Sequence, residues 1–216
     1  MRFFHPMLLS YLGRKTVWPT LLGAAGLAIF ELFPSAPLSG REMLPAAIIV
    51  AHVAWVSWAL ARLDKGEMPF LYTRGFHWDV IWWHRVAVAA LSALAAIAAS
   101  SLVLWLGLRT AAQIGMGDSL YPLVARRESW APMYWLVLYV LLLPVGLYAF
   151  VRAEHEAPLG GLWLAIAIGP TTWFAWNLLA GTAGWLPRAL MVAGGCVVVA
   201  LLWAGQRLHR NVEVAS

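Results

Sequence analysis

The chain has 216 residues, of which 62% are hydrophobic and 12% are charged, and its mean hydropathy is +0.74. These values lie outside the range of soluble globular domains and indicate a polytopic membrane protein. The formal net charge is +5, but the basic residues are scattered through the loops instead of forming one patch. This distribution favours a role in membrane topology and argues against nucleic acid as a partner. The single cysteine, Cys196, excludes an internal disulfide and a cysteine metal cluster.

Residues 1–15 predict an amphipathic interfacial helix that lies flat on the membrane before the first span. Their large apolar side chains share one helical face, and Arg2, Ser10, Arg14 and Lys15 lie elsewhere. The members of the apolar face are Phe3, Phe4, Met7, Leu8, Tyr11 and Leu12.

Six apolar runs follow, each close to the roughly 20 residues that cross ~30 Å of hydrocarbon. They cover about residues 16–33, 43–60, 86–108, 130–150, 162–179 and 186–203. The sequence therefore predicts an all-α polytopic protein of about six transmembrane helices, forming one transmembrane domain over residues 1–216. An even number of spans places both termini on the same side of the membrane.

Lysine and arginine are unevenly divided between the two sides of this predicted topology. The side with the termini carries ten: Arg2, Arg14, Lys15, Arg62, Lys65, Arg74, Arg85, Arg152, Arg207 and Arg210. The other side carries five: Arg41, Arg109, Arg126, Arg127 and Arg188. The positive-inside rule then predicts an inner (cytoplasmic) membrane protein with both termini in the cytoplasm.

One of the predicted spans contains a helix-breaking pair. Gly169-Pro170 interrupts the fifth run, which fits either a simple kink or a pair of re-entrant half-helices.

Many of the fourteen tryptophans lie near predicted span ends and indicate interfacial anchors. These are Trp18, Trp58, Trp82, Trp83, Trp130, Trp185 and Trp203.

Ionisable groups inside the predicted spans are few. The acidic residues lie almost entirely in loops, with Glu31 at the end of the first span, which disfavours an ion-coupled transporter. His52 lies well inside the second span, where an ionisable side chain is a functional candidate by default. A neutral imidazole bonded to a neighbouring helix is the favoured interpretation of His52. His84 lies only at the cytoplasmic edge, so two-histidine haem ligation is not expected.

Catalytic and nucleotide-binding motifs are absent from the sequence. There is no G-x-S-x-G, no H-E-x-x-H and no G-x-x-x-x-G-K-[ST], so the chain is not expected to be an enzyme or to bind ATP itself. Glu154, His155 and Glu156 are interpreted as solvated loop charges. If ATP drives this protein, another chain binds the nucleotide.

The stretch at 61–85, between the second and third predicted spans, mixes charged and aromatic residues. A turn is expected at Arg74-Gly75, followed by a short helix that continues into the apolar run starting at Val86. Asp79 lies near the positive N-terminal end of that helix. This pattern predicts a bent amphipathic elbow on the cytoplasmic surface of the membrane.

The elbow resembles the cytoplasmic coupling helix in permease subunits of type II ABC exporters, the ABC-2 class. In that family an acidic residue precedes an aromatic and hydroxyl-containing turn with a basic residue. The matching residues are Glu67, then Phe70-Leu71-Tyr72-Thr73-Arg74-Gly75-Phe76-His77-Trp78-Asp79, then Trp82-Trp83-His84-Arg85. Gly75 stands where the family commonly has proline.

This resemblance implies a cytoplasmic nucleotide-binding ATPase subunit as the partner of the elbow. The residues expected to contact it are Glu67, Arg74, Phe76, His77, Trp78 and Asp79. Phe76 and Trp78 would supply the apolar anchor, and the charged residues would set the register. The resemblance implies no cofactor in this chain, since ATP and Mg are bound by the partner subunit.

The expected function is that of a membrane-spanning permease subunit that exports a hydrophobic or amphipathic substrate. Its other partners would be membrane lipid and a second permease copy or a related permease, packed through small residues such as Gly23, Gly26, Gly194 and Gly195. An alternative is a structural or assembly subunit of a larger membrane complex without transport activity. A membrane enzyme acting on lipid ranks last, because no catalytic cluster supports it.

Overall fold

A computed structural model of the chain describes residues 5–32, 43–61, 70–71, 73–113, 131–153 and 194–207. Its long helices are α1 (Pro6–Leu32), α2 (Met43–Ala61), α4 (Trp78–Gln113) and α6 (Ala131–Ala153), and a further helix covers 194–207. These described ranges contain no strand, which confirms the all-α prediction for them. The predicted fifth span at 162–179 lies outside the described residues.

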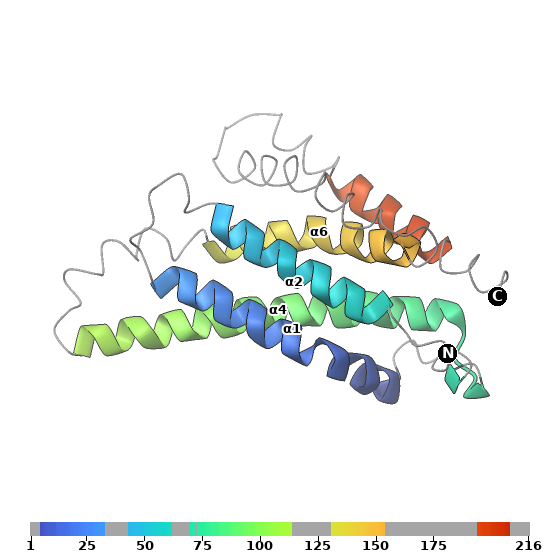
Figure 1. Cartoon of the computed structure of the whole chain (residues 1–216), viewed down its shortest axis with the longest axis horizontal. Coiled ribbons are helices and arrows are strands. Elements are labelled where there is room, and N and C mark those ends of the chain that lie inside the picture. Colours follow the sequence, from blue (N-terminus) through green and yellow to red (C-terminus); the bar gives the residue numbers. More distant parts are fainter. Residues whose placement is uncertain are drawn as a thin grey trace.

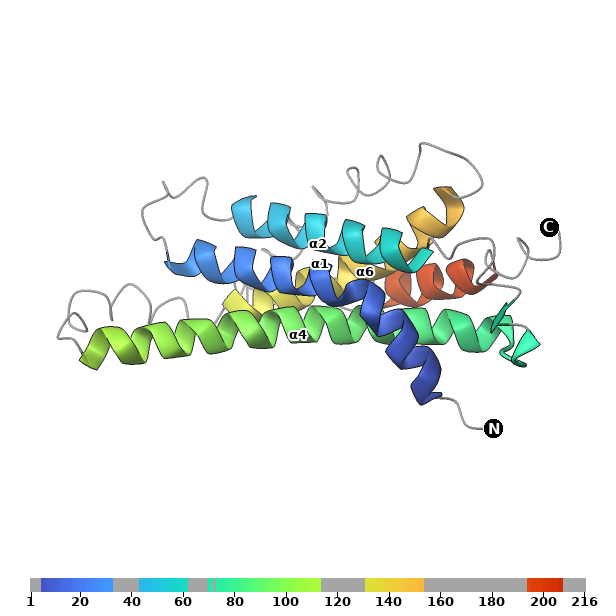
Figure 2. The same cartoon turned by 60° about the horizontal axis from the view of Figure 1, so that its bottom comes forward.

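The four long helices form an up-down-up-down bundle, in which α1 contacts α2 and α4, and α6 contacts the same two helices. Figures 1 and 2 show that helices consecutive in the chain run in opposite directions, so that the contacting helices α1 and α4 run in the same direction, as do α2 and α6. The beginnings of α1 and α4 lie at the same end of the bundle as the ends of α2, α6 and the helix at 194–207. The elbow is therefore at the end where the last described helix finishes.

Buried apolar side chains from all four long helices form one core. Representative members are Leu27 on α1, Val53 and Val56 on α2, Ala89 and Ala93 on α4, and Leu138 and Leu142 on α6. Close helix approach depends on small residues. A Cβ atom on Gly146 of α6 would lie 2.6 Å from Ser57 Oγ of α2, and one on Gly26 of α1 would lie 3.2 Å from Ile48 Cγ2. Gly26 thus packs within the chain.

Residues 6–15 of the predicted interfacial helix and residues 16–32 of the predicted first span are parts of one helix in the structure, α1. Figure 2 shows that the first part of α1 runs at an angle to the rest. Pro19 lies inside α1 and has no N–H to donate to the carbonyl four residues earlier, which accounts for the bend. Leu8 and Leu12 are buried in the protein core, so this part of the expected apolar face contacts protein.

One helix among the described residues is long and apolar enough to cross a membrane, the 30-residue stretch Trp78–Gly107 of α4. At 1.5 Å per residue it spans ~45 Å, more than the ~30 Å hydrocarbon layer. Shorter apolar stretches occur at Ala47–Ala61 in α2 and at Trp135–Phe150 in α6. The outer faces of α1 and α4 expose many large apolar side chains, an arrangement typical of surfaces that contact lipid or another protein. Examples are Trp18, Leu21, Leu22, Leu91, Leu94, Leu102 and Trp105.

Of the seven tryptophans near predicted span ends, Trp130 and Trp185 lie outside the described residues, and the other five divide into two groups. Trp18, Trp58, Trp83 and Trp203 expose large parts of their rings, as expected for interfacial anchors. Trp82 is fully buried, and its interpretation as an anchor is wrong. Its ring packs against the backbone of the helix at 194–207, a contact between segments far apart in the sequence.

Replacing Gly146 by alanine tests the close contact between α2 and α6. The added methyl group would overlap Ser57 and Val53, so we expect Gly146→Ala to lower the free energy of unfolding by about 1–3 kcal/mol. Gly13→Ala is the matched control, because nothing lies within 4 Å of the added atom. Thermal unfolding in detergent measures both variants. Equal stability of the two variants would contradict the close approach.

Candidate functional site

The elbow turns at Gly75, whose φ of 77° lies in the left-handed region. Phe76 N–H donates to the carbonyl of Leu71 over 3.1 Å, closing a six-residue ring that is characteristic of glycine-terminated helix ends. Proline holds φ near −65° and cannot adopt this conformation. The backbone geometry therefore explains why glycine stands where the resembling family commonly has proline.

Helix α4 begins directly after this turn. The carbonyl of His77 accepts hydrogen bonds from the N–H groups of Val80 and Ile81, at 2.9 and 3.1 Å. Asp79 lies in the first turn, where a carboxylate is stabilised by the positive end of the helix dipole. The helix then continues to Gln113. The elbow is thus joined without a break to the longest described helix.

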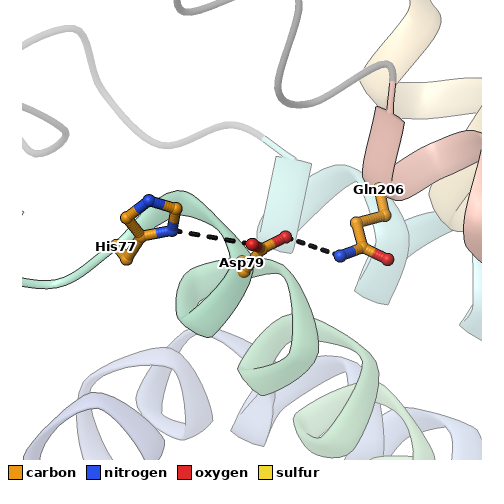
Figure 3. A network of polar contacts seen from close by, with 3 residues as sticks. All are labelled: His77, Asp79 and Gln206. Carbon is orange, nitrogen blue, oxygen red and sulfur yellow. Dashed lines mark hydrogen bonds and ion pairs between the residues drawn. The ribbon is translucent and has the colours of Figure 1, made fainter.

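Asp79 also connects the elbow to the helix at 194–207. Gln206 Nε2–H donates to Asp79 Oδ1 over 2.5 Å, and His77 Nδ1 lies 3.6 Å from the other carboxylate oxygen. Figure 3 shows Asp79 between these two side chains. The carboxylate is 38% exposed and the imidazole 63% exposed, so this small network lies at the protein surface.

A second contact between the same two helices lies deeper in the bundle. A Cβ atom on Gly205 would lie 2.5 Å from Cη2 of Trp82, which means that the indole ring rests on the glycine backbone. Any larger residue at this position would push the helix at 194–207 away from α4. The polar contact at Asp79 and the apolar contact at Trp82 together fix the end of this helix against the start of α4.

Phe76 and Trp78 were expected to anchor a partner, and both are half-buried. Phe76 packs against the core and lies edge-on to the His5 ring, with centroids 4.9 Å apart. The His5 backbone N–H donates to His84 Nε2 over 2.9 Å, so the same region also holds the start of α1. Trp78 stacks at a tilt on His77. Phe76 therefore supports the elbow from inside.

Arg74 and His77 are the exposed residues among those predicted to contact a partner. The guanidinium of Arg74 lies 4.8 Å from the ring centroid of Phe70, which is itself half-exposed. Phe70 was not among the predicted contact residues, although its position four residues before an arginine on a helical turn is a local signal for this stacking. Glu67 lies outside the described residues.

A separate polar cluster lies in the middle of the bundle around His52. His52 Nδ1 is 2.6 Å from the hydroxyl of Tyr139, and its Nε2 is 3.2 Å from Ser92 Oγ. Ser92 Oγ is in turn 2.5 Å from Thr20 Oγ1. The expected bond from His52 to a neighbouring helix is confirmed, and the cluster takes one side chain from each of α1, α2, α4 and α6. His52 also lies against Gly23, so Gly23 packs within the chain.

The elbow motif carries the resemblance to ABC-2 permeases. No family model, no curated protein and no solved structure matches the chain. Membership of that family therefore stays a prediction from the motif residues.

A double-mutant cycle on Asp79 and Gln206 tests the link between the elbow and the helix at 194–207. A hydrogen bond to a charged group stabilises by about 1.5–3 kcal/mol, and partial exposure to solvent places this one below that range. We expect Asp79→Ala and Gln206→Ala to be non-additive in unfolding experiments, with a coupling energy of about 1 kcal/mol.

The control cycle combines Asp79→Ala with Arg207→Ala. Arg207 is adjacent to Gln206, but its guanidinium stacks on the ring of Trp203, 3.6 Å from the centroid. We expect additive effects for this pair. Additivity in both cycles would show that the bond to Gln206 contributes nothing to stability.

Proposed function

We propose that the chain is the membrane-spanning permease subunit of an ATP-driven exporter of the ABC-2 type. In this proposal it lies in the inner membrane with about six spans, both termini in the cytoplasm, and pairs with a second permease. A separate cytoplasmic ATPase subunit binds ATP and Mg and docks on the elbow. The observation that carries the proposal is an exposed elbow continuous with the one described helix that is long enough to cross a membrane.

The bundle geometry supports a topology with more than one span. Helices α1, α2 and α6 lie alongside α4, with α1 running in the same direction as α4 and α2 and α6 in the opposite direction (Figure 1). If α4 crosses the membrane, the helices that pack side by side with it lie inside the membrane as well. The apolar stretches in α2 and α6 and the exposed apolar face of α1 suit that environment.

The exposed part of the elbow suits a docking surface for another protein. Arg74 stacked on the half-exposed ring of Phe70 combines an aromatic anchor with a positive charge, and His77 adds a second polar group nearby in the sequence. Arginine and aromatic residues are enriched among the residues that dominate binding energy at interfaces. An apolar cleft with an acidic rim on the partner would complement this surface.

Helix continuity supports the elbow as a route for mechanical coupling. A displacement of Asp79 by a docked partner would move the start of α4 as part of one helix. The bond from Gln206 and the contact between Trp82 and Gly205 would transmit the displacement to the helix at 194–207. Two helices of the bundle would therefore respond to one docking event.

Charge reversal at Arg74 tests the proposed docking surface. The tagged chain is purified in mild detergent from its native membrane, and soluble proteins that co-purify are identified and assayed for ATP hydrolysis. We expect an ATPase subunit to co-purify with the unmodified chain. Arg74→Glu should reduce its recovery and its stimulated ATP hydrolysis at least severalfold, because a central interface charge is reversed.

Arg109→Glu is the matched control. Like Arg74, Arg109 is exposed and stacks on an aromatic ring, 5.3 Å from the ring centroid of Trp105, but it lies near the end of α4 that is far from the elbow. We expect it to leave the ATPase bound and active. If the chain instead co-purifies with integral membrane subunits and no ATPase, the exporter is ruled out and a structural or assembly subunit is supported.

A further inference from the structure

A groove of about 300 Å³ lies between α1 and α4. Most of its wall is apolar, and none of its lining residues is charged. Leu9, Val17, Leu21 and Leu91 contribute large apolar side chains. The hydroxyl-bearing residues in the lining are Thr16, Thr20 and Ser92, and the last two belong to the polar cluster around His52.

The hydrogen bonds of this cluster form a chain from Tyr139 through His52, Ser92 and Thr20 to the carbonyl of Thr16. Every hydrogen in the chain has an acceptor if each group donates to the next one in this order. The Thr20 hydroxyl donates to the carbonyl of Thr16 over 2.6 Å, so its single hydrogen is used. Ser92 must then donate to Thr20 and accept from Nε2–H of His52. That leaves Nδ1 of His52 without a hydrogen, and it accepts from the hydroxyl of Tyr139. If His52 Nδ1–H instead donated to the Tyr139 oxygen, the hydroxyl hydrogen of Tyr139 would have no acceptor among the described residues.

This direction determines what the groove offers to a ligand. The hydroxyl hydrogens of Thr20 and Ser92 point along the chain of hydrogen bonds, and the Thr16 hydroxyl donates to the carbonyl of Gly13 over 2.9 Å. All three hydroxyl groups have therefore used their hydrogens, and each can only accept a hydrogen bond from a ligand in the groove. A ligand with an O–H group finds acceptors in the groove, whereas an ether or ester oxygen finds no donor.

The position of the groove along α4 determines how much a hydrogen bond to these acceptors would stabilise a ligand. Ser92 lies at the middle of the Trp78–Gly107 stretch, so it would be near the centre of the hydrocarbon layer. Water is scarce at that depth, and a polar group without a partner there costs several kcal/mol. Lipid head groups remain at the surface. A molecule with a hydroxyl group inside the hydrocarbon layer would gain most from an acceptor in the groove.

We propose that the groove between α1 and α4 binds an amphiphile with one hydroxyl group on a long apolar chain. The O–H group donates to the oxygens of Thr16, Thr20 or Ser92, and the apolar chain lies against Leu21 and Leu91. His52 and Tyr139 act as positioning residues, because they hold Ser92 as a donor to Thr20 and leave its lone pair to the groove. This site goes beyond the proposed export function, since binding requires only this chain and no ATPase.

Photolabelling with a matched pair of probes tests the site. The full chain is placed in phosphatidylcholine nanodiscs with hexadecanol that carries a diazirine in its chain, or with the methyl ether of the same molecule. Labelled positions are mapped by mass spectrometry. We expect the alcohol to label the groove residues of α1 and α4 about tenfold more than the ether, the factor that corresponds to one hydrogen bond.

Ser92→Ala should remove most of this preference for the alcohol. The matched control is Ser100→Ala on the same helix, since Ser100 is also buried but donates to the carbonyl of Ile97 and does not line the groove. Thr16→Val gives an independent variant that leaves the four-helix cluster intact, because the Thr16 hydroxyl bonds only within α1. It should lower the preference about twofold or more.

Tyr139→Phe separates positioning from packing. Tyr139 does not line this groove, so total labelling by the apolar chain should be retained. The alcohol-to-ether ratio should fall. Without the Tyr139 hydroxyl, His52 can carry its hydrogen on Nδ1 and no longer donates to Ser92, so the Ser92 hydroxyl is free to rotate its hydrogen into the groove and donate to the ether oxygen. Equal labelling by alcohol and ether in the unmodified chain would overturn the proposal. So would a full preference in both Ser92→Ala and Thr16→Val, whatever the outcome of the ATPase experiment.

Discussion

The imidazole of His52 holds four helices in register, because its hydrogen bonds join α2 to two helices directly and to a third through Ser92. Rotation or sliding of any of these helices would leave a buried polar group without a partner. The apolar core packs the same helices but would tolerate small slips more easily. The ring of His52 also fills the space beside Gly23, so the polar cluster and the close approach of α1 to α2 depend on each other.

Helix α4 links this central cluster to the elbow. It supplies Ser92 at mid-length and Asp79 in its first turn, and it is the described helix that meets the length needed to cross a membrane. The proposed docking surface therefore lies directly before α4, and the proposed groove lies along α4, more than three helical turns beyond its start. A partner at the elbow and a ligand in the groove would each act on the position of α4.

Local signals in the sequence predicted the elbow well. The turn at Arg74-Gly75 and the helix that follows depend on residues next to one another, and the structure has both. Contacts between distant segments were not predictable in this way. Trp82 is buried because Gly205 allows its ring to approach, and Phe76 packs against the core and the ring of His5, which is more than 70 positions away in the sequence. Leu8 and Leu12 fit the pattern of an interfacial helix, and only the packing of the bundle shows that protein covers them.

The bond between Asp79 and Gln206 joins residues separated by 127 positions in the chain. At about 5–20 residues per second, synthesis of the intervening segment takes roughly 6–25 s. During that interval the elbow emerges from the ribosome without the helix that later covers Trp82. The newly made elbow therefore presents the indole of Trp82 and the carboxylate of Asp79 to chaperones and insertion machinery before the helix at 194–207 exists. Completion of that helix covers the indole and supplies Gln206 as the partner of the carboxylate.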